Sequence, residues 1–81
     1  MKLKDEIYIS DNILKIAVDK ARNAKKVLVR QHGTKYRMLD ESFNPLINLT
    51  SGQFTRLTVT GILKYTSGNT YEFNTAARIV S

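Results

Sequence analysis

The feature that most constrains the fold is a pair of alternating stretches on either side of Gly33. In VLVRQH (residues 27–32) and KYRML (residues 35–39), apolar and polar side chains alternate with the period of two that a β-strand requires. A glycine between two such stretches predicts a hairpin, with its turn either at His32-Gly33 (type I′) or at Gly33-Thr34 (type II′). Either turn places the same residues together. We expect a buried face with Val27, Val29, Tyr36 and Met38, and an opposite face with Leu28, Arg30, His32, Lys35, Arg37 and Leu39.

The segment before this hairpin has the period of a helix. In DNILKIAVDKARNAKK, the apolar residues recur at helical spacing and the charged ones lie between them. Ser10 or Asp11 offers an N-cap, and Lys25 and Lys26 are cations near the C-terminal end, where the helix dipole favours them. We expect a helix over residues 11–25, preceded by a short strand over residues 3–9.

The C-terminal half predicts further strands. Leu46, Ile47 and Leu49 follow the only proline, Pro45, and are typical of a short edge strand. Residues 54–66 and 70–80 predict a second hairpin around Ser67–Asn69. Its expected cross-strand pairs are Leu63–Phe73, Tyr65–Tyr71 and Lys64–Glu72 near the turn, then Val59–Ala77 and Leu57–Ile79.

Together these elements predict a single small basic domain over residues 1–81. Its expected class is α+β, with one N-terminal α-helix packed on a mainly antiparallel sheet of four to five strands. With 81 residues there is room for a helix layer on a sheet and little room for a deep cleft.

Composition argues against several classes of site. The chain has no cysteine and one histidine, which argues against a disulfide framework and against a zinc site. It has no phosphate-binding glycine motif, no serine–carboxylate set at a recognised spacing from His32, and no apolar run long enough to span a membrane. The N-terminus lacks the apolar region of a signal peptide. We therefore expect a cytoplasmic protein with no enzymatic activity, cofactor, metal or membrane partner.

The charge balance points to an acidic partner. Thirteen Lys and Arg stand against seven Asp and Glu, a formal net charge of +6. Strand alternation gathers several of these cations on one face of the first hairpin, although like charges across a hairpin cost stability. The candidate binding residues for nucleic acid or an acidic protein are Lys25, Lys26, Arg30, His32, Lys35 and Arg37. The alternative for these cations is a solvated outer sheet face without a ligand. We expect His32 to be a residue of the turn; the alternative is a ribonuclease-like catalytic histidine.

Residues 7–42, IYISDNILKIAVDKARNAKKVLVRQHGTKYRMLDES, carry a further pattern. The order strand, capped helix, strand, RxxG and strand resembles the N-terminal half of Phd/YefM-type antitoxins. The resemblance implies a DNA-binding dimer that represses its own operon and neutralises a toxin. Ile13 occupies the position that matches the arginine this family uses on DNA.

Two hypotheses of function follow. The first is a small non-enzymatic binding protein whose basic sheet face contacts nucleic acid, in a regulatory role and with a homodimer as its candidate assembly. The alternative is an inhibitor or adaptor of the kind that mobile elements such as phages encode. It would dock on an acidic protein surface or in the nucleic-acid channel of a host enzyme.

Overall fold

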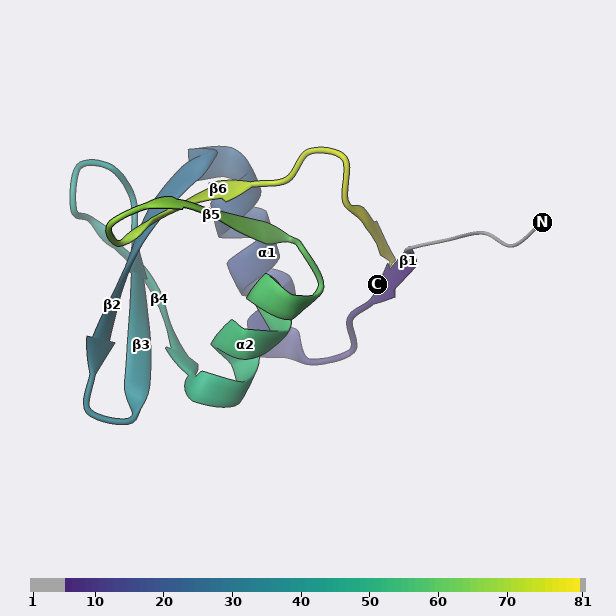
Figure 1. Cartoon of the computed structure of the whole chain (residues 1–81). Coiled ribbons are helices and arrows are strands. Elements are labelled where there is room, and N and C mark those ends of the chain that lie inside the picture. The colour runs from purple at the N-terminus through teal and green to yellow at the C-terminus, as the bar shows by residue number, and fades with distance from the viewer. Residues whose placement is uncertain (1–5, 81) are drawn as a thin grey trace.

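A computed structural model describes residues 6–80 and has an α+β fold (Figure 1). The elements run in the order β1 (Glu6–Tyr8), α1 (Asn12–Ala24), β2 (Lys26–His32), β3 (Lys35–Leu39), β4 (Pro45–Thr50), α2 (Ser51–Val59), β5 (Leu63–Ser67), β6 (Thr70–Phe73) and β7 (Arg78–Val80). The predicted fold class is confirmed. The second helix and a small parallel sheet were not predicted.

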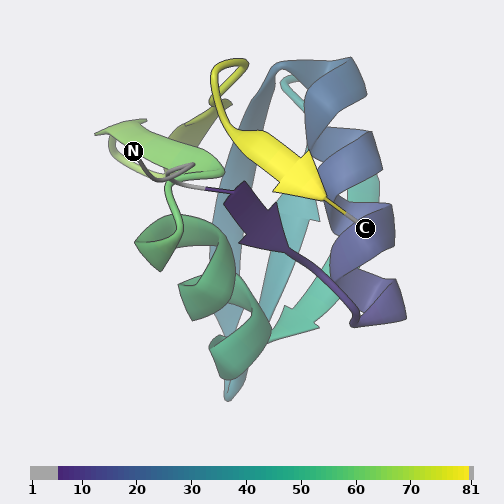
Figure 2. The same cartoon turned by 90° about the vertical axis from the view of Figure 1, so that its right-hand side faces the viewer.

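Five strands form an antiparallel sheet in the order β4-β3-β2-β6-β5. Both helices and the β1–β7 pair lie on one side of this sheet (Figure 2), and no described element covers its other side. The core fills the space between these layers. Its buried side chains include Val27, Val29 and Met38 from the sheet and Leu14, Ala17, Val18 and Ala21 from α1. The uncovered side of the sheet is therefore the surface on which a ligand could lie.

The first hairpin has the predicted pairing, but Leu39, which was expected on the face opposite the core, is buried. Leu28 lies opposite Leu39, Arg30 opposite Arg37, and His32 opposite Lys35, so Gly33 and Thr34 are the two turn residues. Gly33 has φ +65° and Thr34 has no positive φ, the combination of a type II′ turn. Of the two predicted turns, Gly33-Thr34 is the one observed.

Helix α1 is also where the sequence predicts it. Its N-cap is Asp11, whose carboxylate accepts hydrogen bonds from the backbone N–H groups of Ile13 and Leu14 at 2.8 and 3.3 Å. The helix ends at Ala24, and β2 begins at Lys26. The strand predicted over residues 3–9 appears as β1. Residues 3–5, including Leu3, lie outside the described residues.

The prediction of a strand from residue 54 was wrong, because residues 51–59 form helix α2. Thr50 caps this helix: its hydroxyl accepts from the Gln53 backbone N–H, and the Gln53 side chain accepts from the Thr50 backbone N–H. This reciprocal capping box marks the start of the helix, in a segment whose threonines and valine favour a strand. Gly61, with φ +82°, lies just beyond the C-cap residue Thr60.

The second hairpin is correspondingly shorter than predicted. The pairs Leu63–Phe73, Lys64–Glu72 and Tyr65–Tyr71 are confirmed. The pairs Val59–Ala77 and Leu57–Ile79 are wrong, since α2 occupies the position of the first strand. The C-terminal strand β7 pairs instead with β1, in parallel, with Ile79 opposite Ile7.

Candidate nucleic-acid interface

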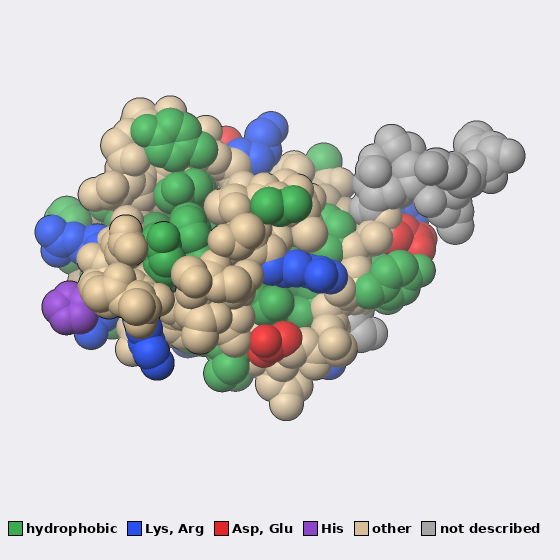
Figure 3. Space-filling model, turned by 60° about the horizontal axis from the view of Figure 1, so that its bottom comes forward, with side chains coloured by type: hydrophobic (Ala, Val, Ile, Leu, Met, Phe, Trp, Pro, Cys, Tyr) green, Lys and Arg blue, Asp and Glu red, His purple; other side chains and the backbone are tan. Residues whose placement is uncertain are grey.

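Four side chains gather on the uncovered side of the sheet, at the turn end of the β2–β3 hairpin. Arg30 lies directly opposite Arg37, and His32 directly opposite Lys35. All four are exposed. We call these four residues the basic hairpin face. Figure 3 shows Lys and Arg side chains around the histidine at this end of the molecule.

Few acidic groups oppose this charge. Strands β2 and β3 contain no Asp or Glu, and the ion pairs found among residues 6–80, Arg22–Asp19 and Arg78–Glu6, involve none of the four residues. The Cβ atoms of directly opposed residues in a sheet lie about 5 Å apart, so the like charges of Arg30 and Arg37 disfavour each other, and an anion between them would relieve that repulsion. The basic hairpin face is therefore set to attract an anion.

The nearest carboxylate along the chain is used inside its own loop. Asp40 accepts hydrogen bonds from the backbone N–H groups of Asn44 and Ser42, both at 2.9 Å, and from the Asn44 side-chain amide at 3.2 Å. The backbone bond from Asn44 is the main reason that the pKa of Asp40 is lowered. This carboxylate stays ionised and satisfied in the loop.

Arg37 is partly held in place. Its Nε donates to the side-chain oxygen of Asn48 on β4, at 3.3 Å. Since only Nε makes this bond, the two terminal guanidinium nitrogens, Nη1 and Nη2, can still donate hydrogen bonds to an oxyanion. Arg30, His32 and Arg37 also line a hollow of about 310 Å³ together with Gln31 and Leu39. Asn48 was not predicted as part of the site.

The two remaining candidate residues lie elsewhere. Lys26 is on the same face, but at the other end of β2, opposite Glu72, which is itself opposite Lys64. Lys25 is the C-cap residue of α1 and lines a different hollow, with Arg22 and Lys64 among its neighbours. The structure therefore brings together four of the six predicted residues and separates Lys25 and Lys26 from them.

His32 has no companion for acid–base chemistry among the described residues. Contrary to the prediction from the sequence, it is not one of the two turn residues but the last residue of β2, exposed and opposite Lys35. A general base needs a group that orients it and a substrate within hydrogen-bond reach. The residues that share its hollow carry cations, an amide and an aliphatic chain, so its surroundings suit contact with an anion better than proton transfer.

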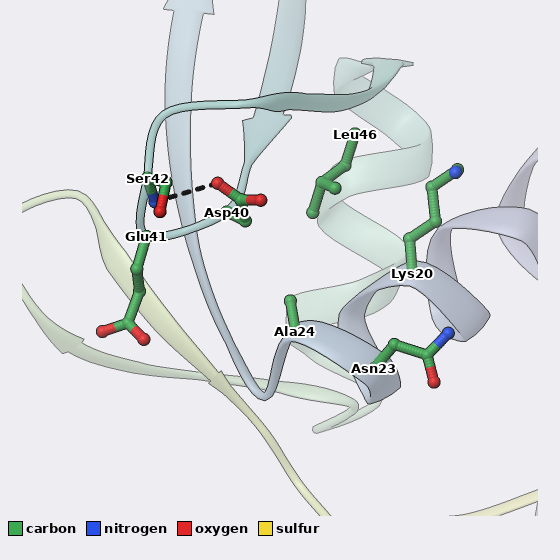
Figure 4. A pocket seen from close by; sticks show the side chains of 7 residues that line it. All are labelled: Lys20, Asn23, Ala24, Asp40, Glu41, Ser42 and Leu46. Atoms are coloured by element: carbon green, nitrogen blue, oxygen red, sulfur yellow. Dashed lines mark hydrogen bonds between the residues drawn. The ribbon is translucent and has the colours of Figure 1, made fainter.

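A larger hollow lies between α1 and the loop that joins β3 to β4 (Figure 4). It measures about 460 Å³ and is lined by Lys20, Asn23, Ala24, Asp40, Glu41, Ser42 and Leu46. In Figure 4 the Glu41 side chain points away from α1, and the Asp40 carboxylate is bonded within its loop. The polar groups therefore do not converge on a common point, as a catalytic or ligand-binding pocket would require.

Comparisons of the chain with protein-family models, curated proteins and solved structures found no match. Across residues 6–80, no group of three or more His, Asp or Glu side chains is placed to hold a metal ion. Neither helix in that range is long and apolar enough to cross a membrane. The basic hairpin face is thus the feature on which a function can be argued.

Proposed function

We propose that the protein is a non-enzymatic, cytoplasmic nucleic-acid-binding regulator that holds phosphates on the basic hairpin face. The observation that carries this proposal is the direct pairing of Arg30 with Arg37 and of His32 with Lys35, on two strands that contain no acidic residue. The regulatory role, and a homodimer that would present two such faces, are proposed from the resemblance of residues 7–42 to Phd/YefM-type antitoxins.

Phosphate is the ligand that fits this face best. A guanidinium offers two parallel N–H donors to a phosphate, and the bond from Arg37 to Asn48 leaves such a pair available. An anion between Arg30 and Arg37 would attract both guanidinium groups and so offset their mutual repulsion. Two successive phosphates of a nucleic-acid strand lie about 6 to 7 Å apart, which matches the spacing of alternate residues on a strand. Contacts of this kind fix position and contribute affinity without reading sequence.

The test is binding of labelled oligonucleotides, followed by fluorescence anisotropy at several salt concentrations. The triple variant Arg30→Gln, Lys35→Gln, Arg37→Gln should lose most of its affinity at low salt. The slope of log K against log salt should become shallower by about 0.7 to 0.9 for each phosphate contact removed. Circular dichroism should show an intact fold, because the three side chains are exposed.

A matched control removes the same charge elsewhere. The triple variant Lys15→Gln, Lys20→Gln, Lys64→Gln also lowers the net charge by three but leaves the basic hairpin face intact. It should lose much less affinity. Equal losses in both variants would mean that net charge alone attracts nucleic acid. If the wild-type protein shows no affinity for DNA or RNA at low salt, the proposal fails, and docking on an acidic protein surface becomes the better hypothesis.

A further inference from the structure

Four aromatic side chains form a continuous row on the helix side of the sheet. The ring of Tyr36 on β3 stacks on Phe54 of α2, with centroids 4.6 Å apart and planes inclined by 21°. Phe54 meets the ring of Tyr71 on β6 edge-on at 5.3 Å, and Tyr71 meets Tyr65 on β5 at 5.5 Å. The row joins four different elements and includes four of the seven aromatic residues in the chain.

This row is incompletely covered by the rest of the protein. Tyr65 is 63% exposed, and Tyr36, Phe54 and Tyr71 are half-buried against the core. Within the described residues, the hydroxyls of the three tyrosines make no hydrogen bond, although the hydroxyl of Tyr8 does. Figure 3 shows hydrophobic side chains open to solvent on the face that adjoins the histidine and its neighbouring cations. Tyr65 therefore leaves the outer end of the row open to solvent.

One end of the row, Tyr36, adjoins the basic hairpin face, whereas Tyr71 lies opposite Val27, toward the other end of β2. Tyr36 lies between Lys35 and Arg37 in the chain, so its ring and their cations are on opposite faces of one strand. Strand β2 pairs with β6 only as far as Leu28, with one more bond from the Val29 N–H to Asn69. Beyond Val29 this edge of β2 pairs with no strand among the described residues, so a flexible nucleic-acid strand can pass around it from one face of the sheet to the other.

We propose that the aromatic row is a stacking surface for unpaired bases of a single-stranded nucleic acid whose phosphates lie on the basic hairpin face. The inference rests on the proposed function and specifies its ligand. Every base presents a π-face, so exposed tyrosine rings accept bases of any sequence, whereas a duplex keeps its bases stacked on one another. A row of this length suits about two or three bases.

The experiment compares two variants with matched exposure. Tyr65→Leu removes the outermost ring of the row, and Tyr8→Leu removes a tyrosine that is 62% exposed but lies on β1, outside the row. The probes are labelled dT12, labelled rU12 and a duplex of the same length. Tyr65→Leu should weaken binding of dT12, rU12 or both by about tenfold and leave duplex binding unchanged. Tyr8→Leu should change none of them, and Tyr65→Phe should restore wild-type affinity because it keeps the ring.

The outcomes separate this inference from the function on which it rests. If the wild-type protein binds oligonucleotides through the basic hairpin face but Tyr65→Leu binds both single strands within about twofold of wild type, the stacking surface is wrong and the proposed function stands. A preference of the wild type for duplex would have the same meaning. If the wild type binds no oligonucleotide, both proposals fail. A loss limited to dT12 or to rU12 supports stacking and identifies the sugar.

Discussion

Lys25 has a backbone conformation that its side chain disfavours. It links α1 to β2 with φ +71° and ψ −46°, in the positive-φ region where a Cβ atom is crowded. Its backbone N–H still donates to Ala21, and its carbonyl accepts from Phe73. These two backbone hydrogen bonds fix the path of the chain at residue 25, and neither of them involves the lysine side chain.

We expect Lys25→Gly to stabilise the protein by about 1 kcal/mol, since glycine relieves strain of this kind. In a chain of this size the melting temperature should rise by about 4 to 8 °C. Lys26→Gly is the matched control, because Lys26 lies in a regular strand, where glycine weakens pairing. Thermal unfolding of both variants measures the contrast. A lower melting temperature for Lys25→Gly would show that its side chain supports the fold.

At the scale of single residues, the cations of the basic hairpin face were predictable from the sequence, but the side chain that hydrogen-bonds to one of them was not. Arg30 and Arg37 share a face because strand alternation and the glycine turn determine it. Asn48, which orients Arg37, is eleven residues away on a strand whose pairing with β3 has an irregular register near Leu39. No local pattern in the sequence indicates that contact.

At the scale of elements, one glutamine connects the starts of both helices. Within α2, the Gln53 side-chain carbonyl accepts from the Thr50 backbone N–H at 2.9 Å. Its side-chain amide nitrogen donates to the Asp11 carboxylate, the N-cap of α1, at 3.1 Å. This bond is the main reason that the pKa of Asp11 is lowered. A single side chain thus satisfies groups at two helix ends.

This arrangement predicts a rescue by exchange. Gln53→Glu keeps an acceptor for Thr50, and capping boxes tolerate glutamate, but it loses the donor to Asp11 and places two carboxylates together. The variant should unfold at a lower urea concentration than wild type. Adding Asp11→Asn should recover most of that loss, because the asparagine amide can donate to the introduced glutamate while its oxygen still caps α1.

The recovery distinguishes a specific bond from a general effect on α2. Asp11→Asn alone serves as the control and should shift the urea midpoint only slightly, since asparagine is an N-cap of similar quality. If the double variant is no more stable than Gln53→Glu, then Gln53 does not connect the two helices in solution.

Helix α2 could have been found in the sequence from TSGQ, residues 50–53, which is a capping-box pattern. The following residues, FTRLTVT, are rich in β-branched side chains and alternate well enough to predict a strand. The structure resolves this conflict through tertiary contact. Leu57 is buried in the core, and Phe54 packs between Tyr36 and Tyr71.

At the scale of the whole molecule, the features that the sequence did not predict are those made by distant segments. Strands β1 and β7 come from opposite ends of the described chain, and the aromatic row takes one ring from each of four elements. Periodicity reports only which way a side chain points within its own element. Among these contacts, Tyr65–Tyr71 was predictable because a short turn joins its strands.

The free energy of unfolding should decrease in acid because two carboxylates, Asp11 and Asp40, are stabilised in their ionised form. The pKa values of Asp11 and Asp40 are both lowered in the folded protein, chiefly by bonds from the Gln53 side chain and the Asn44 backbone, respectively. A lowered folded-state pKa means that the stabilisation is complete above the unfolded-state value, near 3.8, and is lost as the pH falls through the folded-state value.

We therefore expect the free energy of unfolding to be nearly constant from pH 7 to about pH 5, and to decrease below that. Urea unfolding followed by circular dichroism at each pH measures it. The double variant Asp11→Asn, Asp40→Asn should show a flatter profile in acid, because neither position can then be protonated. An unchanged acid limb in that variant would assign the loss to other carboxylates.

The parallel pairing of β1 with β7 has a mechanical consequence. Residues 6–8 enter the pair at the end where residue 78 lies, and the chain leaves it at the opposite end, after residue 80. A force that pulls the two ends of the chain apart therefore slides one strand along the other and loads the bonds between them together. In the β2–β3 hairpin, by contrast, pulling the open ends apart would break the bonds one at a time. The first resistance to stretching should thus come from this short parallel pair, while the basic hairpin face at the far end of the molecule (Figure 1) stays unloaded until the pair separates.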